Sequence, residues 1–567
     1  MNYKMMGRFT AQMLLIEGIF LIPALLISLF LGESAAAYGF AVTLGLIALV
    51  GGPMYFFCRD AKSAFYATDG MVCVAVSWLV LSLVGAIPFY VSEAIPSYID
   101  ALFETVSGFT TTGASILPEV EHMARGLMYW RSFTHWVGGM GVLVFLLAIA
   151  PSKGNEQGFT MHLLRAESPG PSVGKLVPKM RKTAAILYFL YITLTVLDFL
   201  FLIVGGMPVF DAVCTSFGTA GTGGFGIKND SIASYSPYLQ NVTTVFMLLF
   251  GVNFSCYYLL TLRQIKNVLK DEELRLYVLI VLGSIGLVVW NLGDFYPTLE
   301  ETVRHAAFQV SSIITTTGFA TTDFDLWPSF SRTILLCLMV IGACAGSTGG
   351  GLKVARVLLL FKSLKRNIAQ MLHPRKVQVI RNNGSVVSER IVANTNAYLC
   401  AYVVLMFGSF VLISLDGYSV GTNFSAVLSC LNNIGPGLEL AGPTCNFSIF
   451  STFSKLVLIL DMLLGRLEIF PILVLFSLQT WKNASIHRSV GAASSRPQPR
   501  ILASTRLNGS FPTSSHPTYR SIPSACGRML SAPTAGISVV IGLPKTIDND
   551  HAINAHFSHS AASNRKL

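Results

Sequence analysis

The stretch that decides the fold is Phe103-Glu-Thr-Val-Ser-Gly-Phe-Thr-Thr-Thr-Gly113, a short amphipathic run that ends in threonines and glycine. Three later stretches repeat this pattern: Val213-Cys-Thr-Ser-Phe-Gly-Thr-Ala-Gly-Thr-Gly223, Phe308-Gln-Val-Ser-Ser-Ile-Ile-Thr-Thr-Thr-Gly318 and Ser425-Ala-Val-Leu-Ser-Cys-Leu-Asn-Asn-Ile-Gly435. Their final glycines are 110, 95 and 117 residues apart. A period of about 100 residues, with an apolar span before and after each stretch, predicts a helix, re-entrant loop and helix repeated four times.

The composition places these repeats in a membrane. Of the 567 residues, 52% are hydrophobic and 12% are charged, and the mean hydropathy is +0.59. A typical soluble domain carries about 25% charged residues, so a single soluble globule is excluded. Ten apolar stretches are long enough to cross about 30 Å of hydrocarbon: 9–31, 38–57, 71–91, 127–150, 184–204, 242–262, 276–292, 333–361, 392–415 and 453–480.

The fold class that follows is an all-α polytopic membrane protein, with four helix–pore loop–helix repeats around one pseudo-fourfold pore. Two helices in residues 1–68 precede repeat 1 (69–182) and repeat 2 (183–274). Repeat 3 (275–390) contains an intramembrane loop, and repeat 4 (391–482) completes the ring. The serine-rich and proline-rich residues 483–567 cannot bury a core and are predicted to be disordered.

The distribution of charge gives the orientation. The segment 483–567 carries nine Lys and Arg against two acids and so holds +7 of the net charge of +11, which argues against a nucleic-acid-binding face. In the rest of the chain, every second connection is basic, starting with Lys4 and Arg8, and the alternate connections are mostly acidic. Because cytoplasmic loops are rich in Lys and Arg, both termini are predicted to lie in the cytoplasm.

The four repeated stretches have the chemistry of a potassium filter. A ten-residue helix is only about 15 Å long, so the chain must enter the bilayer and return. Rings of backbone carbonyls can replace the hydration shell of potassium, whereas divalent ions favour carboxylates. Threonine- and glycine-rich segments also serve as helix-packing faces. Their fourfold repetition favours the filter.

Several motifs resemble the TrkH branch of the bacterial Trk/Ktr/HKT potassium-transporter superfamily, over residues 1–482. They are Ser107-Gly-Phe-Thr-Thr-Thr-Gly-Ala114, Thr222-Gly-Gly-Phe225, Thr315-Thr-Thr-Gly-Phe319, Asn432-Asn-Ile-Gly-Pro-Gly437, Ala343-Cys-Ala-Gly-Ser-Thr-Gly-Gly-Gly-Leu-Lys353 and Leu463-Leu-Gly-Arg-Leu-Glu-Ile-Phe470. The resemblance implies four filter glycines: Gly113, Gly223, Gly318 and Gly435. It also implies that carbonyls of the preceding residues bind potassium, from the set Thr111, Thr112, Thr222, Thr317, Asn433 and Ile434.

The resemblance implies a gate as well. An intramembrane loop beneath the filter would comprise Gly346, Ser347, Thr348, Gly349, Gly350 and Gly351. Each glycine disfavours a helix by about 1 kcal/mol relative to alanine, so a helix cannot continue well through this stretch, although a packing kink is the alternative. Arg466 would add a positive barrier below the filter. A charge there needs a cavity or partners, and Glu468 or Asp461 are candidates.

The resemblance further implies a bacterial inner-membrane protein, a homodimer and a cytoplasmic ring of TrkA-type nucleotide-binding regulatory subunits. Potassium would be the transported ligand, with no cofactor and no enzymatic activity. Coupling of potassium to protons or sodium is the main alternative, and a sodium-conducting relative is another. In the tail, Val539-Val-Ile-Gly-Leu-Pro-Lys-Thr-Ile-Asp-Asn-Asp550 resembles a phosphofructokinase segment without the rest of that enzyme. We interpret the tail as a frameshift or fusion product, with a regulatory tail as the alternative.

Overall fold

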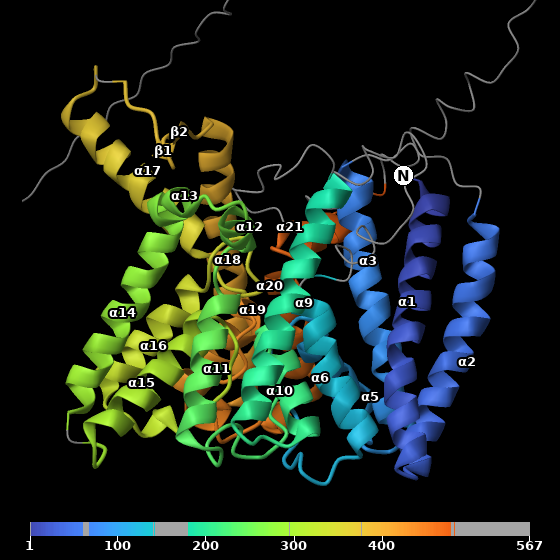
Figure 1. Ribbon diagram of the computed structural model, residues 1–567. Coiled ribbons are helices and arrows are strands. Elements are labelled where there is room, and N and C mark those ends of the chain that lie inside the picture. The colour runs from blue at the N-terminus through green and yellow to red at the C-terminus, as the bar shows by residue number, and fades with distance from the viewer. Residues whose placement is uncertain are drawn as a thin grey trace, which may run out of the picture. The chain divides into compact units, whose positions relative to one another are not determined.

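The computed structural model describes residues 2–59, 67–139, 141, 180–293, 295–375, 377–477 and 481. In this part of the chain the regular elements are helices, apart from one hairpin in which β1 (Arg381–Asn382) pairs antiparallel with β2 (Ser385–Val386). The protein is therefore an all-α polytopic membrane protein (Figure 1), as the sequence predicts. The tail 483–567 lies outside the described residues.

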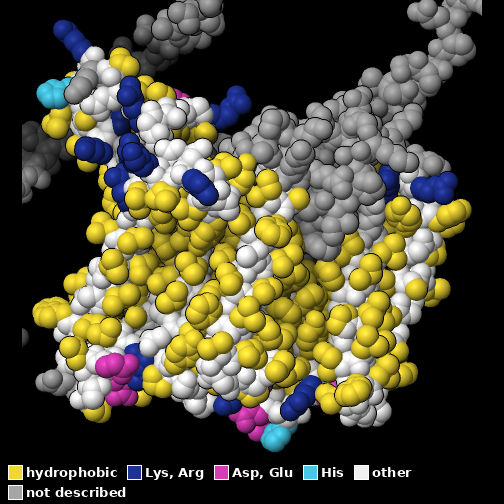
Figure 2. Space-filling model, viewed as in Figure 1, with side chains coloured by type: hydrophobic (Ala, Val, Ile, Leu, Met, Phe, Trp, Pro, Cys, Tyr) yellow, Lys and Arg dark blue, Asp and Glu magenta, His cyan; other side chains and the backbone are white. Residues whose placement is uncertain are grey.

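Six helical segments of the described chain are long and apolar enough to cross a membrane. They are α1 (Tyr3–Phe30), α2 (Ser34–Phe57), α3 (Ala67–Gly85) continued by α4 (Ile87–Val91), α9 (Met180–Val204), α14 (Glu272–Leu292) and α18 (Glu389–Ile413). They coincide with six of the ten predicted spans. Their outward faces contribute to a broad apolar belt on the surface (Figure 2), which suits a lipid environment.

Between these long helices lie four half-length helices of the described chain: α5 (Tyr98–Phe109), α10 (Val209–Gly221), α15 (Leu299–Ile314) and α19 (Val420–Asn432). They contain 12, 13, 16 and 13 residues, so each is about 18–24 Å long and falls short of the hydrocarbon thickness. The side chains of Ser97, Thr298 and Ser419 cap the first turns of α5, α15 and α19. These caps satisfy backbone N–H groups where the helices begin.

The helix that follows each half-helix is short or broken. After α5 comes the short helix α6 (Arg125–Gly139). After each of the other three half-helices come two helices separated by a break: α11 (Pro237–Phe250) and α12 (Phe254–Thr261), α16 (Ser329–Ile341) and α17 (Val354–Leu372), and α20 (Thr452–Arg466) and α21 (Phe470–Phe476). The break in span 333–361 was predicted. Span 127–150 is described only as far as Gly139, together with Gly141.

The prediction of continuous spans at 242–262 and 453–480 was wrong. The axes of α11 and α12 differ by 89°, because the side chain of Asn253 accepts a hydrogen bond from the N–H of Ser255 and starts a new helix. Between α20 and α21, Glu468 and Ile469 adopt positive φ angles of 54° and 67°. This left-handed backbone cannot continue a right-handed helix.

The remaining elements are short. They are α13 (Ile265–Lys270), η1 (Phe324–Leu326), η2 (Ser414–Asp416), η3 (Glu439–Ala441) and η4 (Phe447–Ile449). Figure 2 shows Lys and Arg gathered over α13 and α17 at one end of the molecule, and acidic side chains together with a few Lys and Arg at the opposite end. The chain starts at the basic end (Figure 1). This segregation of charge agrees with the alternation in the sequence.

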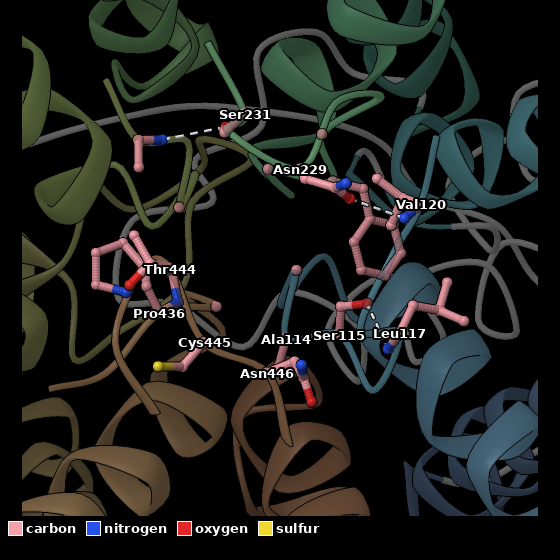
Figure 3. Close-up of a pocket in the computed structure, with 18 of the residues that line it drawn as sticks. Ala114, Ser115, Leu117, Val120, Asn229, Ser231, Pro436, Thr444, Cys445 and Asn446 are labelled. Carbon is pink, nitrogen blue, oxygen red and sulfur yellow. Dashed lines mark hydrogen bonds between the residues drawn. The ribbon is translucent and has the colours of Figure 1, made fainter. Parts of the chain in front are cut away.

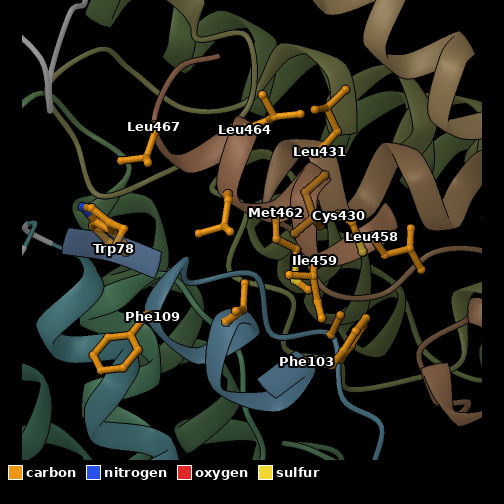
Figure 4. Close-up of a cluster of buried hydrophobic side chains, with 14 of the residues drawn as sticks. Trp78, Phe103, Phe109, Cys430, Leu431, Leu458, Ile459, Met462, Leu464 and Leu467 are labelled. Atoms are coloured by element: carbon orange, nitrogen blue, oxygen red, sulfur yellow. The ribbon is translucent and has the colours of Figure 1, made fainter. Parts of the chain in front are cut away.

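A continuous apolar core packs behind the half-helices. Figure 4 shows Phe103 and Phe109 of α5 in one buried cluster with Cys430 and Leu431 of α19 and Met462 of α20. These five side chains are at most 2% exposed. Repeats 1 and 4, which are far apart in sequence, are thereby packed together, and this packing fixes where the ends of α5 and α19 meet.

Candidate functional site

All four half-helices end in the same backbone motif. At the end of α5, the N–H of Thr112 donates to the carbonyl of Ser107 at 2.8 Å, and the N–H of Thr111 donates to Gly108 at 3.1 Å. This pair of bonds is the Schellman motif. It recurs in the donor–acceptor pairs Gly223–Gly218 and Thr222–Thr219, Thr317–Ser312 and Thr316–Ile313, and Ile434–Ser429 and Asn433–Cys430. The four repeats are therefore equivalent at the level of individual hydrogen bonds.

The residue at the turn of each motif has a left-handed backbone, although none of the four is glycine. The φ angles lie between 53° and 58° at Thr111, Thr222, Thr316 and Asn433. For β-branched threonine this conformation is a genuine outlier, and such strain tends to be stored at functional sites. The surrounding packing holds these turns, since all four residues are at most 1% exposed.

Each turn leads into a central loop, and the four central loops are residues 110–113, 221–224, 315–318 and 432–435. They contact one another in a closed circle. A Cβ on Gly113 would overlap the carbonyl oxygen of Gly223, and the same relation holds for Gly224 with Thr317 and for Gly318 with Ile434. The circle closes at Gly435, whose Cβ would lie 2.8 Å from the carbonyl oxygen of Thr112.

These contacts correct the register of the second loop. The equivalent glycines are Gly113, Gly224, Gly318 and Gly435, which have φ angles of 78°, 77°, 85° and 105°. The sequence analysis aligned Gly223 with Gly113, but Gly223 occupies the place of Thr112 one residue earlier. The segment Thr222-Gly-Gly contains adjacent glycines, so its sequence alone does not distinguish the two registers.

Hydroxyl groups stiffen the first and third loops in the same way. The Oγ1 of Thr110 donates to the carbonyl of Val106 at 2.7 Å and lies 2.8 Å from Oγ1 of Thr112. Thr315 and Thr317 repeat this arrangement with the same 2.8 Å separation. In the fourth loop, Nδ2 of Asn433 donates to Oγ1 of Thr112 at 2.9 Å and to the carbonyl of Met462 at 2.9 Å. Asn433 thus joins the last loop to the first.

The central loops border a cavity of about 170 Å³ at the side where the chain leaves them, and we call this cavity the vestibule. Its floor includes the four equivalent glycines, and its walls are the segments that follow them (Figure 3). Hydrogen bonds join these segments in sequence around the vestibule. They run from Val120 N to Asn229 (2.9 Å), from Ala320 N to Ser231 (3.2 Å), from Thr444 to Asp323 (3.3 Å) and from Phe447 N to the carbonyl of Ser115 (2.8 Å).

Residues 342–353, between α16 and α17, are non-helical and contain the predicted intramembrane loop, a name that we keep for them. It lies against the central loops from the side opposite the vestibule, because a Cβ on Gly350 would overlap the carbonyl oxygen of Asn432. The N–H of Gly350 donates to Oγ1 of Thr316 at 2.7 Å. The predicted residues Gly346, Ser347, Thr348, Gly349, Gly350 and Gly351 all lie in this loop.

The intramembrane loop also fills the bend between α11 and α12. The N–H of Phe254 donates to the carbonyl of Gly346 at 3.0 Å, and the N–H of Cys344 donates to the carbonyl of Gly251 at 3.1 Å. Oε1 of Glu273 accepts from the N–H of Ala345 at 2.5 Å. Non-helical backbone at membrane depth needs such partners. The backbone of the bend and the backbone of the intramembrane loop therefore supply each other's hydrogen-bond partners.

Arg466 lies at the end of α20 and donates hydrogen bonds to backbone carbonyls. Its Nη1 donates to the carbonyl of Thr348 at 3.1 Å, and its Nη2 donates to Gly138 and to Gly139, the latter at 2.6 Å. Arg466 therefore connects the intramembrane loop to the end of α6.

The predicted partners of Arg466 are engaged elsewhere. Glu468 forms ion pairs with Arg356 and, at 2.8 Å, with Lys353. Asp461 accepts a hydrogen bond from Ser409 at 2.6 Å. The expectation that Arg466 pairs with either acid is therefore wrong, because the break after α20 turns Glu468 toward the start of α17.

Two ion pairs made by acids of α5 were not found from the sequence, and in the first of them both side chains are buried. Arg131 pairs with Glu104 at 2.6 Å, and Lys455 pairs with Asp100 at 2.7 Å. The sequence feature that could have pointed to Glu104 is that it is an acid in a stretch otherwise rich in Ser and Thr. Among the described residues, no group of three or more His, Cys, Asp and Glu could hold a metal ion.

Half-length helices whose C-terminal ends converge among long apolar helices are typical of membrane transport proteins. A family model described as "TrkH: Cation transport protein" matches residues 39–487. The chain belongs to the TrkH family.

Relatives and a solved structure agree with this assignment. The Trk system potassium uptake protein TrkH of Salmonella typhimurium is 35% identical over 491 residues, which cover 85% of this chain and 100% of the relative. The TrkG protein of the Trk potassium uptake system of Escherichia coli K12 is 33% identical, covering 82% and 95%. The crystal structure of the potassium transporter TrkH from Vibrio parahaemolyticus matches with a TM-score of 0.76 and 31% identity, over 85% of this chain and 100% of that one.

Proposed function

We propose that this protein takes up potassium across the bacterial inner membrane through a filter made by the four central loops. The observation that carries the proposal is the closed circle of contacts from Gly113 through Gly224 and Gly318 to Gly435. The names of the relatives support potassium as the transported ion. Backbone carbonyls would bind it, from Thr111, Thr112, Gly113, Thr222, Gly223, Thr317, Gly318, Asn433, Ile434 and Gly435, with Gly224 added by the corrected register.

The chemistry of the circle suits a monovalent cation. None of the sixteen central-loop residues is acidic, so carbonyl and hydroxyl oxygens are the available ligands. The negative ends of four helix dipoles converge there, because each half-helix ends at its central loop. The corresponding arrangement in transporters coordinates cations with half-helix C-termini and unwound carbonyls. Potassium is the substrate of this site and not a resident cofactor.

We further propose that the intramembrane loop and Arg466 form the gate. The loop contacts the central loops on the side opposite the vestibule, at Thr316 and Asn432. Arg466 is held against the same loop through the carbonyl of Thr348 and adds a positive charge there. Opening would require the loop to leave Thr316, and the hydrogen bonds of Arg466 oppose that movement.

The assembly that we propose is a homodimer, with both termini in the cytoplasm and a TrkA-type nucleotide-binding ring at the cytoplasmic face. The basic side chains over α13 and α17 support this orientation (Figure 2). They also offer a surface for a regulatory partner. Transport is the proposed activity, without an enzymatic reaction or a nucleic-acid partner.

The test is ion flux into proteoliposomes that contain the full chain alone. Potassium and rubidium should enter well ahead of sodium, and Gly318→Ser should lose this preference, because its side chain would collide with the carbonyl of Ile434. Gly286→Ser is the matched control, since a Cβ there meets no atom within 4 Å. Equal selectivity in both variants would contradict the filter. Flux that requires a proton or sodium gradient would establish ion-coupled symport instead.

A further inference from the structure

A permanent positive charge lies at the vestibule. The side chain of Arg131, on α6, is 2% exposed and lines the cavity together with Phe225 and Gly226. Its guanidinium carbon lies 3.6 Å from the centroid of the Phe225 ring, directly after the second central loop. Arginine stays protonated in proteins. A fixed cation at this place would oppose the entry of another cation unless its charge is cancelled.

Within the described part of the chain, Arg131 forms an ion pair with one carboxylate. Oε1 of Glu104, on the half-helix α5, lies 2.6 Å from Nε of Arg131, and the Glu104 side chain is fully buried. The same carboxylate accepts hydrogen bonds from Oγ of Ser115 at 2.9 Å and from the N–H of Ile116 at 2.9 Å. Both of its oxygens are therefore engaged, as a buried carboxylate requires.

The pair also connects two repeats. Nη1 of Arg131 donates to the carbonyl of Gly226 at 3.0 Å, just after the second central loop. Nη2 of Arg131 donates to Oγ of Ser115 at 3.2 Å, just after the first central loop. One ion pair thus holds the outward continuations of two neighbouring loops at a fixed separation.

We infer that Glu104 is the counter-charge that allows Arg131 to brace the vestibule without repelling potassium. The inference rests on the proposed potassium pathway, and it assigns two separable roles. Arg131 positions the first and second loops, and Glu104 cancels its charge in a region where burial leaves little solvent screening. Glu104 and Arg131 are positioning residues, because neither belongs to the central loops.

The two roles predict opposite consequences for flux. Glu104→Gln keeps the size of the side chain but leaves the Arg131 charge uncancelled, so potassium flux should fall at least about tenfold. Arg131→Gln removes the cation, so flux should fall by less than about threefold while the preference for potassium over sodium decreases. The double variant Glu104→Gln/Arg131→Gln should recover flux relative to Glu104→Gln, although its selectivity stays low. A purely structural ion pair would give equal losses in both single variants.

The experiment compares initial potassium, rubidium and sodium fluxes in proteoliposomes of the full chain. Glu300→Gln is the matched control, because Glu300 also sits on a half-helix and pairs with an arginine, Arg304, but is 63% exposed. Glu104→Asp keeps the charge and should retain flux even if its melting temperature falls. This variant separates folding from electrostatics.

Three outcomes are distinguishable. Recovery of flux in the double variant supports the counter-charge. Equal loss in Glu104→Gln, Arg131→Gln and the double variant overturns the inference and leaves the potassium pathway intact. Absence of selective potassium flux in the unaltered chain overturns the proposed function itself.

Discussion

The backbone N–H of Gly350 donates a 2.7 Å hydrogen bond to Oγ1 of Thr316. Gly350 belongs to the intramembrane loop, and Thr316 is the left-handed residue that ends the third half-helix. One hydrogen bond thus joins the proposed gate directly to the proposed filter. A movement of the gate must break this hydrogen bond, and a displacement of Thr316 in the filter must shift Gly350 in the gate.

Removal of this hydrogen bond should favour the open state. Thr316→Val keeps the shape of the side chain but loses the acceptor, which is worth about 1 kcal/mol, so basal potassium flux should rise about fivefold. Thr111→Val is the comparison, because Thr111 has the same left-handed backbone and its hydroxyl has no partner within the described residues. Equal changes in both variants would contradict a role for the Gly350 contact.

The corrected register of the second loop can be tested by rescue. A Cβ on Gly223 would collide with the ring of His135, whereas a Cβ on Gly224 would collide with the carbonyl of Thr317. Both Gly223→Ala and Gly224→Ala should lower potassium selectivity. His135→Ala should restore much of it to Gly223→Ala, because the ring is removed, and should leave Gly224→Ala impaired. Rescue of Gly224→Ala but not of Gly223→Ala, measured as the ratio of potassium to sodium flux, would contradict the corrected register.

The two contributions of Arg466 can be separated by charge. Arg466→Gln removes the positive barrier and weakens the bonds to Thr348 and Gly139, so basal flux should rise about tenfold. Arg466→Lys keeps the charge but cannot reproduce the forked contacts, so its flux should lie between that of Arg466→Gln and that of the unaltered chain. Flux assays in proteoliposomes decide this, and a lower flux in Arg466→Gln would contradict the gate.

The stability of the N-terminal end of α19, the fourth half-helix, should depend on pH. Glu439, outside the membrane-spanning helices, accepts hydrogen bonds from Ser419 and, at 2.9 and 3.1 Å, from Oγ1 and N–H of Thr422 at the start of α19. These bonds hold the pKa of Glu439 below its usual value of 4.5. A lowered pKa contributes stability above the ordinary pKa, and this contribution is lost as the pH falls through the folded-state value.

Glu439→Gln should therefore lower thermal stability at pH 7. Because Glu439 is exposed, the expected loss is only about 0.5 kcal/mol. The difference between Glu439→Gln and the unaltered chain should shrink as the pH is lowered from 5 toward 3. Melting curves in detergent over this range measure it, and a difference independent of pH would assign the effect to packing.

The sequence predicted the long helices and the four half-helices because both have simple signatures. Apolar length marks a span, and the repeated Thr- and Gly-rich endings mark the half-helices. The bends after Phe250 and Arg466 were missed, since Gly251, Val252 and Leu467 are as apolar as the helices around them. The bend after Phe250 has a tertiary cause, because the intramembrane loop provides hydrogen-bond partners for the backbone of Gly251 and Phe254. At the break after Arg466, the side chain of Glu468 pairs with Lys353 and Arg356 at the start of α17.

The four loops that the sequence singled out contact one another in the structure, with the second loop shifted by one residue, whereas both predicted partners of Arg466 lie elsewhere. The oxygens that bind Arg466 are backbone carbonyls 118 and about 328 residues away, and every residue has a carbonyl, so no pattern identifies them. The pairing of Glu104 with Arg131 also depends on how α5 and α6 cross. Sequence patterns give the type of a group, and packing decides its partner.

The hydrogen bond from Asn433 to Thr112 spans 321 residues and joins the last quarter of the circle to the first. During synthesis the first three loops enter the membrane before the residue that closes them exists. Until the fourth repeat is made, Thr112 and Gly113 lack the contacts that the fourth central loop provides. Assembly of the circle is therefore a late, long-range event, and a chain truncated before residue 433 would hold three correct quarters without a finished pathway.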